Sequence, residues 1–370
     1  MGNALLGYWL AFRRPRVLVP GPVRTEYVEV PGPERVERVE VPGPVRTEIV
    51  EVPGPERVER VEVPGPERIV AVHASPHIGE GPLPTAVGTG LPLERDTAAD
   101  TVVDGADLGP LRVRATSQRG GRNRTDQRHR RDGLLLHTFR GFARPVLLSV
   151  AAAGNPVGQW SQAGAVLASK SLVTHLHTFA GPLEAALSGD GGQDTVTDLV
   201  RSTLRGAAKN LDRLADRHQV SPEQVSTEIV ALLTPLGDAV GRRHLMFGAG
   251  SGEVLLHRQG RWSTAGSAVT GEGAGPVADT ASWRADRALP VGESAAYWRT
   301  FETGPGDLVL VCTGATAQLF RRPETADFFA EVWSDGIPDL HQFLWQTGVR
   351  VPGAEADRTL ICLWEAAGSV

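Results

Sequence analysis

The sequence is poor in cysteine, in lysine and in long apolar runs. Two cysteines, Cys312 and Cys362, are too few for a disulfide framework, and both lie in apolar runs typical of buried strands. Acidic residues outnumber basic residues by 43 to 38, which gives a net charge of −5. That balance argues against a protein whose main partner is nucleic acid or an anionic membrane. The composition therefore favours a reducing, cytoplasmic setting.

The apolar run near the N-terminus is too short to cross a membrane. Residues 4–12 are apolar, whereas a span needs about 20 such residues. Arginines follow this run and no basic residue precedes it, which is the wrong order for a secretory signal. We therefore expect no transmembrane segment. Two interpretations of the segment 1–18 remain open. It is either a small anchor centred on Tyr8 and Trp9 or a frayed terminus.

A repeat with a period of 11 residues fills positions 19–72. The motif Val-Pro-Gly-Pro occurs five times, starting at Val19, Val30, Val41, Val52 and Val63. Two prolines in each period exclude a right-handed coiled coil. The pattern predicts an extended or polyproline-like arm punctuated by turns. This arm is either a docking segment that repeats one short epitope or a tether without a partner.

A linker is expected at residues 73–106 and a globular domain at 107–366. Alternating and continuous apolar runs predict strands, and apolar residues at a period of 3.6 predict helices. The clearest strands are at 146–151, 227–233, 244–248, 253–257, 308–312 and 359–364, and helices are expected at 160–179, 195–217 and 323–333. Strands and helices do not alternate, so the fold class is α+β with antiparallel sheets.

Several short motifs in this domain fall in one order and spacing. They are Arg130-Arg131-Asp132, Ala151-Ala152-Ala153-Gly154, Gly248-Ala249-Gly250, Gly304-Pro305-Gly306-Asp307 followed by Val311-Cys312-Thr313-Gly314-Ala315, and Ala356-Asp357-Arg358-Thr359. In this order the chain resembles the PPM-type (type 2C) metal-dependent Ser/Thr phosphatases, in particular their compact actinobacterial branch. The resemblance implies a four-layer sandwich, in which helix pairs flank two antiparallel sheets and a metal site lies at one edge.

The departures from the family pattern fall on its metal ligands. The resemblance implies that the places of four family aspartates hold Ala153, Ala249, Gly314 and Ala356 here. Asp132 matches a surviving ligand of the second ion, and Gly154 matches a residue that binds through its carbonyl. The adjacent Asp357 is a weak candidate for a compensating ligand.

The loss of these aspartates predicts a pseudophosphatase. A pair of Mg²⁺ or Mn²⁺ ions needs several carboxylates, and a hydrolytic water needs the ions. We therefore expect no cofactor and a regulatory or scaffolding role in Ser/Thr phospho-signalling. Two rival hypotheses remain: an active phosphatase that uses Mg²⁺ or Mn²⁺ at a divergent or single-metal site, and a structural protein in which the repeats are the functional part.

An arginine-rich stretch precedes the Asp132 motif. Eight arginines lie within residues 112–131, and Arg130 is the nearest match to the family's phosphate-binding arginine. Guanidinium groups bind phosphate without a metal, so a phosphoprotein or a component of a Ser/Thr kinase pathway is a candidate partner. A solvated loop neutralised by its own acids is the alternative. The glycine cluster at 248–252 lacks the ending of a phosphate-binding loop, and we predict a hairpin turn there.

Overall fold

The computed structural model describes two compact units, Met1–Ser75 and Pro76–Val370. The described residues are 16–18, 24–30, 35–41, 45–51, 58–64 and 69–71, for the backbone only, and 76–78, 91–93, 98–237, 241–265, 283–334 and 336–366. The N-terminal apolar run at 4–12 lies outside them.

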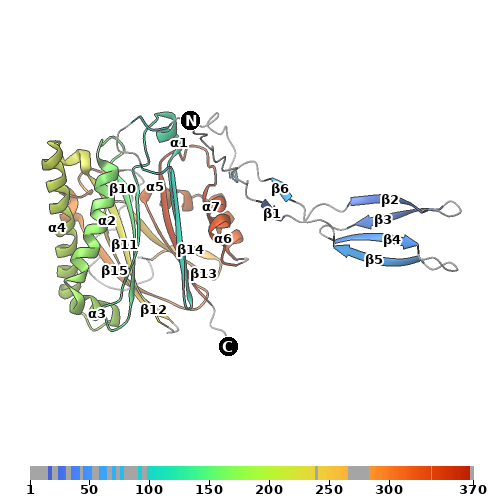
Figure 1. Ribbon diagram of the computed structural model, residues 1–370. Coiled ribbons are helices and arrows are strands. Elements are labelled where there is room, and N and C mark those ends of the chain that lie inside the picture. The colour runs from blue at the N-terminus through green and yellow to red at the C-terminus, as the bar shows by residue number, and fades with distance from the viewer. Residues whose placement is uncertain are drawn as a thin grey trace, which may run out of the picture. The chain divides into compact units, whose positions relative to one another are not determined.

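The repeats of the first unit form antiparallel strand pairs (Figure 1). The pairs are β2 (Arg24–Val30) with β3 (Arg35–Val41), β4 (Val45–Glu51) with β5 (Val58–Pro64), and β1 (Arg16–Leu18) with β6 (Ile69–Ala71). The segments are extended, but they double back instead of continuing as one polyproline-like arm. The alternation of valine with Arg, Glu and Thr suits such a ladder, because β-branched residues favour strands and the backbone groups then pair.

The second unit contains two antiparallel sheets. The five-stranded sheet has the order β15 (Tyr297–Thr303), β12 (Arg242–Ala249), β11 (Thr227–Pro235), β10 (Val146–Gly154) and β9 (Gly133–Phe139). The six-stranded sheet has the order β14 (Arg261–Thr264), β13 (Glu253–Arg258), β16 (Leu308–Cys312), β17 (Arg358–Glu365), β8 (Leu111–Gln118) and β7 (Thr101–Leu108).

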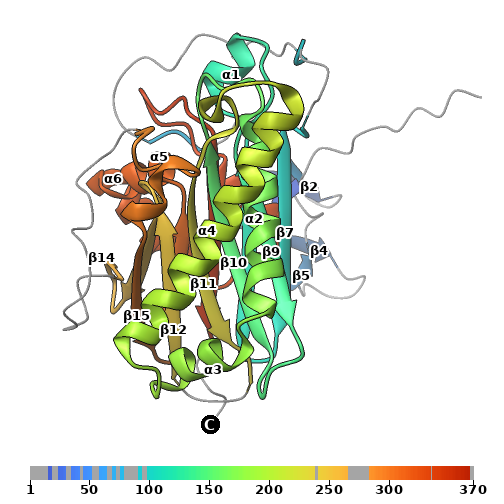
Figure 2. The same cartoon turned by 90° about the vertical axis from the view of Figure 1, so that its left-hand side faces the viewer.

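Helices cover the outer face of each sheet, so the unit has four layers (Figures 1 and 2). The five-stranded sheet carries α2 (Ser161–His177), α3 (Ala180–Ser188) and α4 (Gln193–His218). The six-stranded sheet carries α5 (Gly314–Phe320), α6 (Pro323–Ser334) and α7 (Leu340–Thr347). The predicted α+β sandwich is confirmed. No helix in the described part of the chain combines the length and apolar character that a membrane span requires.

The central strands are apolar on both faces because they lie between two layers. In β10, Leu148 and Val150 face the helices α2 and α4, while Leu147 and Ala151 face the other sheet. In β17, Cys362 lies in the core under α5, α6 and α7. The alternation of side chains along a strand assigns each residue to one of the two cores. Both cysteines are free and fully buried, as their apolar surroundings predicted.

Several elements differ from those that the sequence indicates. The six-stranded sheet begins with β7 at Thr101, inside the stretch expected to be a linker, because Thr101–Leu108 pairs with β8 along its whole length. Helix α4 begins at Gln193, before the expected start at Thr195, and its N-cap Gly192 makes no side-chain capping bond. Helix α7 was not expected, although its N-cap Asp339 forms a complete capping box with Gln342.

The glycine cluster at 248–252 is not a hairpin turn. It joins β12 of the five-stranded sheet to β13 of the six-stranded sheet, and those two strands do not pair with each other. Gly250 has a φ of +106°, and a Cβ there would overlap the side chain of Glu228. The glycines therefore let the chain cross between the sheets while passing close to Glu228.

Close packing of α2 generates a prediction about stability. A Cβ at Gly164 would overlap the backbone carbonyl of Val225, whereas a Cβ at Gly181 in α3 meets nothing within 4 Å. Ala is normally the better helix former. We expect Gly181→Ala to be neutral or to stabilise by about 0.5 kcal/mol, and Gly164→Ala to destabilise by about 2 kcal/mol. Urea unfolding measures both, and equal effects of the two substitutions would contradict the packing.

Candidate functional site

The antiparallel registers bring many strand ends to one edge of each sheet. Edge here means the border formed by the ends of the strands, not an outermost strand. In the five-stranded sheet, Gly154 at the end of β10 pairs with Thr227 at the start of β11, and Ala249 ends β12 beside Ile229. In the six-stranded sheet, Cys312 at the end of β16 pairs with Leu360 near the start of β17. Loops that follow or precede these ends therefore lie at the same two edges.

The residues singled out as counterparts of the family's metal ligands lie at these edges, whereas Asp307 of the Gly-Pro-Gly-Asp motif directly precedes β16 at the opposite end of that strand. Asp132 directly precedes β9, Ala153 and Gly154 end β10, Ala249 ends β12, Gly314 begins α5, and Ala356 lies two residues before β17. The sequence placed these positions in one site by resemblance alone. The register explains why positions so far apart in the chain come together.

Asp132 joins the two edges through hydrogen bonds. Its carboxyl oxygen accepts from the hydroxyl of Thr359, at 3.0 Å, and from that of Thr313, at 3.4 Å. The Ser117 and Thr359 hydroxyl oxygens are 2.6 Å apart, and because Thr359 donates its proton to Asp132, Ser117 is the donor to Thr359. Burial and the neighbouring Asp357 raise the pKa of Asp132 well above its ordinary value of 3.8. This environment favours the neutral carboxyl more than water does.

Asp357 fixes the loop that leads to Asp132. One carboxylate oxygen accepts from the backbone N–H of Gly120, at 2.6 Å, and the other from that of Arg131, also at 2.6 Å. The side-chain amide of Asn123 donates to both oxygens at 2.9 Å. These four contacts use the acceptor capacity of a carboxylate. Asp357 therefore has a structural role and offers no free oxygen to a metal.

Thr313, rather than Gly314, is the residue of its motif that contacts Asp132. Thr313 is the N-cap position of α5, and Gly314 is the first residue of that helix and lies against Ser251. A Cβ at Gly314 would overlap the Ser251 hydroxyl. Thr313 is therefore a second candidate for this place, and the assignment to Gly314 stays a prediction.

Two arginines beside the edge are buried. Arg130, the candidate phosphate ligand, is 5% exposed, and its Nε donates to the carbonyl of Ala99 at 3.2 Å. Burial lowers the pKa of Arg130. Nearby carboxylates oppose this shift, and the largest opposing effect comes from Asp132. Arg131 donates to the carbonyl of Gly158 and, at 3.0 Å, to the hydroxyl of Ser161. The phosphate-binding role of Arg130 stays a prediction, because so little of its side chain reaches the surface.

Sequence reasoning missed a carboxylate at the same edge. Glu228 in β11 pairs in register with Ala153, is 3% exposed and accepts a short hydrogen bond from the Ser251 hydroxyl. Burial raises the pKa of Glu228. The Tyr297 hydroxyl donates to the carbonyl of Gly252 at 2.7 Å, on the same crossing segment. A single acid at the start of an otherwise apolar strand was the signal that could have identified Glu228.

The residues at this edge do not fit a pair of divalent cations. The described residues contain no group of three His, Cys, Asp or Glu side chains placed to hold a metal ion. Asp132 is engaged by two hydroxyl donors, and the guanidinium of Arg131 adds positive charge next to the end of β10. Hard cations need several oxygen ligands of negative charge, and the aligned positions supply methyl groups and a glycine instead.

A scan against protein-family models found no match to the chain, and a search of curated proteins found none either. Structural neighbours include PPM-type Ser/Thr phosphatases. PppA of Pseudomonas aeruginosa, a key regulatory component of T6SS, is 16% identical with a TM-score of 0.44, over 70% of this chain and 99% of that chain. The serine/threonine phosphatase of S. agalactiae is 14% identical with a TM-score of 0.42, over 69% and 99%. The catalytic domain of PstP in complex with 2 manganese ions is 16% identical with a TM-score of 0.37, over 69% and 98%.

The buried carboxyl of Asp132 generates a prediction about pH. Its raised folded pKa means that the folded protein keeps a proton that the unfolded chain releases above about pH 4. Asp132 therefore destabilises the fold progressively as the pH rises from about 4 through the folded pKa. Asn cannot ionise, so the melting temperature of Asp132→Asn relative to the native protein should rise between pH 4 and pH 8.

The control for this experiment is Asp126→Asn, because Asp126 is exposed. Its melting temperature should follow that of the native protein across the same pH range. A difference between Asp132→Asn and the native protein that stays constant with pH would show that Asp132 is ionised in the fold.

Proposed function

We propose that this chain is a PPM-type phosphatase-like protein that has lost two-metal hydrolysis and acts as a regulator in Ser/Thr phospho-signalling by binding a phosphorylated protein partner. The observation that carries the proposal is the set of contacts around Asp132. The one aspartate that survives at the family's metal-ligand positions is bound by Thr313 and Thr359, in the place where a metal would need free oxygen atoms.

The order of the motifs and the four-layer sandwich support the phosphatase-like part of the proposal. The positions that match the family's metal ligands lie at one edge of the paired sheets, and the residues around them keep the fold intact through hydrogen bonds. The cytoplasmic setting and the docking role of the repeat arm stay predictions. A protein that binds a phosphorylated partner without hydrolysing it needs the residues of this edge but does not need the metal ligands.

The rival hypothesis is an active phosphatase with a divergent site. Glu228 favours it, because this acid lies in register with Ala153 and is a carboxylate at the right edge. Its contact with Ser251 and its burial count against it, since both hold the acid in place without a cation. Measurement of Mn²⁺ binding by calorimetry together with p-nitrophenyl phosphate turnover separates the two hypotheses. We expect neither tight Mn²⁺ binding nor Mn²⁺-dependent turnover, and turnover at the rate of an active relative would refute the proposal.

Restoring the carboxylates tests whether their loss accounts for inactivity. We expect the triple variant Ala153→Asp, Thr313→Asp and Ala356→Asp to melt at a lower temperature without metal, because the new carboxylates repel one another and Asp132. Mn²⁺ should then raise its melting temperature by about 5 °C or more, since it binds only the folded state. Native protein should show no such rise.

The matched comparison moves one substitution by a single residue. A triple variant with Gly314→Asp in place of Thr313→Asp should be destabilised with and without Mn²⁺, because a side chain at Gly314 overlaps Ser251. If Mn²⁺ rescues the Gly314 variant and not the Thr313 variant, the assignment of this position to Thr313 is wrong.

A further inference from the structure

The second unit begins with a short segment that backbone hydrogen bonds fix to the rest of that unit. The N–H of Ile78 donates to the carbonyl of Arg350 at 3.1 Å, and the N–H of Arg350 donates to the carbonyl of Pro76 at 2.7 Å. His77 and Arg350 therefore form a parallel bridge. The first residues after the repeat unit thus lie against the α7–β17 connection, which comprises residues 348–357. We call residues 76–78 the strap.

Ile78 is the anchor of the strap. It is 9% exposed and belongs to the core that lies under α5, α6 and α7. Val349 and Val351, on either side of Arg350, are buried in the same core. His77 is exposed. The gain from one buried isoleucine and two hydrogen bonds is similar in size to the cost of ordering three residues, so this contact is able to open while the rest of the domain stays folded.

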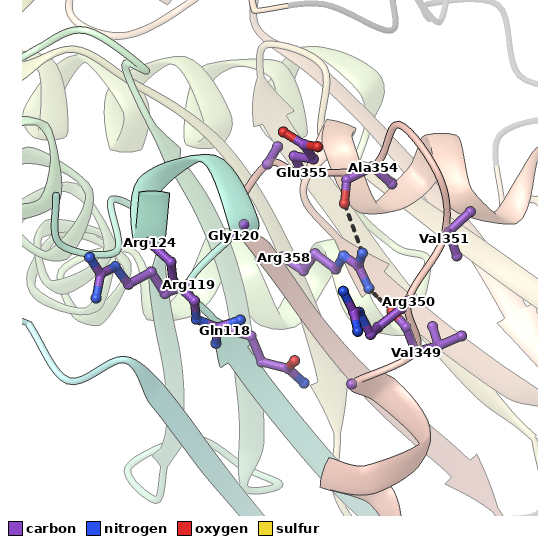
Figure 3. Close-up of a pocket in the computed structure, with 13 residues that line it drawn as sticks. Gln118, Arg119, Gly120, Arg124, Val349, Arg350, Val351, Ala354, Glu355 and Arg358 are labelled. Atoms are coloured by element: carbon purple, nitrogen blue, oxygen red, sulfur yellow. Dashed lines mark hydrogen bonds between the residues drawn. The ribbon is translucent and has the colours of Figure 1, made fainter. Parts of the chain in front are cut away.

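Arg358 ties the strap end of the connection to the end that lies at the candidate site. The guanidinium of this residue, at the start of β17, donates to the carbonyl oxygen of Val349 and, at 2.9 Å, to that of Ala354 (Figure 3). Val349 directly precedes the residue that pairs with the strap, and Ala354 lies three residues before Asp357. One planar group binds both carbonyls, so the two parts of the connection are held at a fixed separation.

The site end of the connection packs closely against α1 (Gly121–Thr125) and the loop around it. The carbonyl of Glu355 accepts from the N–H of Arg122 at 3.1 Å. A Cβ at Gly120 would overlap that same carbonyl, so the two backbones pass each other at close range. Asp357 binds the backbone at both ends of the loop. A displacement of the connection therefore displaces the loop.

We propose that the strap is a releasable positioning element of the candidate site. While Ile78 is docked, the connection holds Asp357 against the loop that leads to Asp132, and release of Ile78 loosens that loop. The strap directly follows the repeat unit in the chain. A protein that takes up the strap in extended form while bound to the repeats would bind only the released state, and would shift the population toward a loosened site. The inference does not depend on the phosphorylated partner of the proposed function.

The first test is hydrogen–deuterium exchange of the full chain, measured at the amides of Gly120 and Arg131. Ile78→Asp places a charge at a core position and should release the strap, so both amides should exchange about tenfold faster. The matched control His77→Asp places the same charge on the exposed neighbour and should leave both amides unchanged. Thermal melts identify any variant that does not fold.

A comparison amide separates positioning from a general loss of stability. The amide of Asn155 is bonded to the carbonyl of Ser226 in a different loop. If Ile78→Asp accelerates exchange at Asn155 as much as at Gly120 and Arg131, Ile78 only stabilises the fold and the proposal is wrong. Acceleration confined to the bridge between residues 78 and 350 would overturn it equally. If Ile78→Asp does not fold, Ile78→Ala should give a smaller increase at the same two amides, and Ile78→Val none.

The second test asks whether the effect passes through Asp357. Asp357→Asn removes one of the two acceptor oxygens and should by itself accelerate exchange at Gly120 or Arg131. In this background Ile78→Asp should add less than about a twofold increase, because the link between the connection and the loop is already weakened. An undiminished increase in the double variant would refute positioning through Asp357. The first test decides the proposal if Asp357→Asn does not fold.

Discussion

The hydrogen bonds that Asp357 accepts hold the candidate site together. This carboxylate lies just before β17 and binds the backbone at Gly120 and Arg131, which are the two ends of the loop that leads to Asp132. Because the loop is fixed at both ends, Asp132 is placed against Thr313 and Thr359 of the six-stranded sheet. The contact between the two sheet edges follows from this attachment.

The chemistry of the edge is that of hydrogen bonds between neutral and singly charged groups. A site with two divalent cations gathers like-charged carboxylates and relies on the ions to hold them together. Here hydroxyls donate to Asp132, a hydroxyl donates to Glu228, and backbone amides donate to Asp357. Each acid is satisfied inside the protein, so the edge is stable as protein alone.

Much of the fold was predictable from sequence because apolar patterning is strong where a strand lies between two layers. The strand at 308–312 has the predicted bounds, and α2 and α6 lie within about two residues of theirs. Elements at the margin were missed for a physical reason. β7 is an edge strand with exposed and half-buried residues, and α7 is a short helix whose capping box lies in a polar segment.

The site was predictable as a set of positions and not as a set of contacts. The motifs identified Ala153, Ala249 and Asp132, which lie at the edge. Whether Thr313 or Gly314 contacts Asp132 depends on how α5 begins, and the role of Asp357 depends on a loop 226 residues or more away in the chain. The place of Glu228 beside Ala153 arises from the register between strands, which a single sequence does not encode locally.

The paired strands of the repeat unit restrict how its length can change. Each hairpin combines one segment that contains Val-Arg-Thr-Glu with one that contains Glu-Arg-Val-Glu, so the structural unit is two periods of the sequence repeat. Insertion or loss of a single 11-residue period would leave a strand with its backbone groups unpaired. Duplication or deletion of whole hairpins would preserve every pair, so the unit can lengthen or shorten only in even steps.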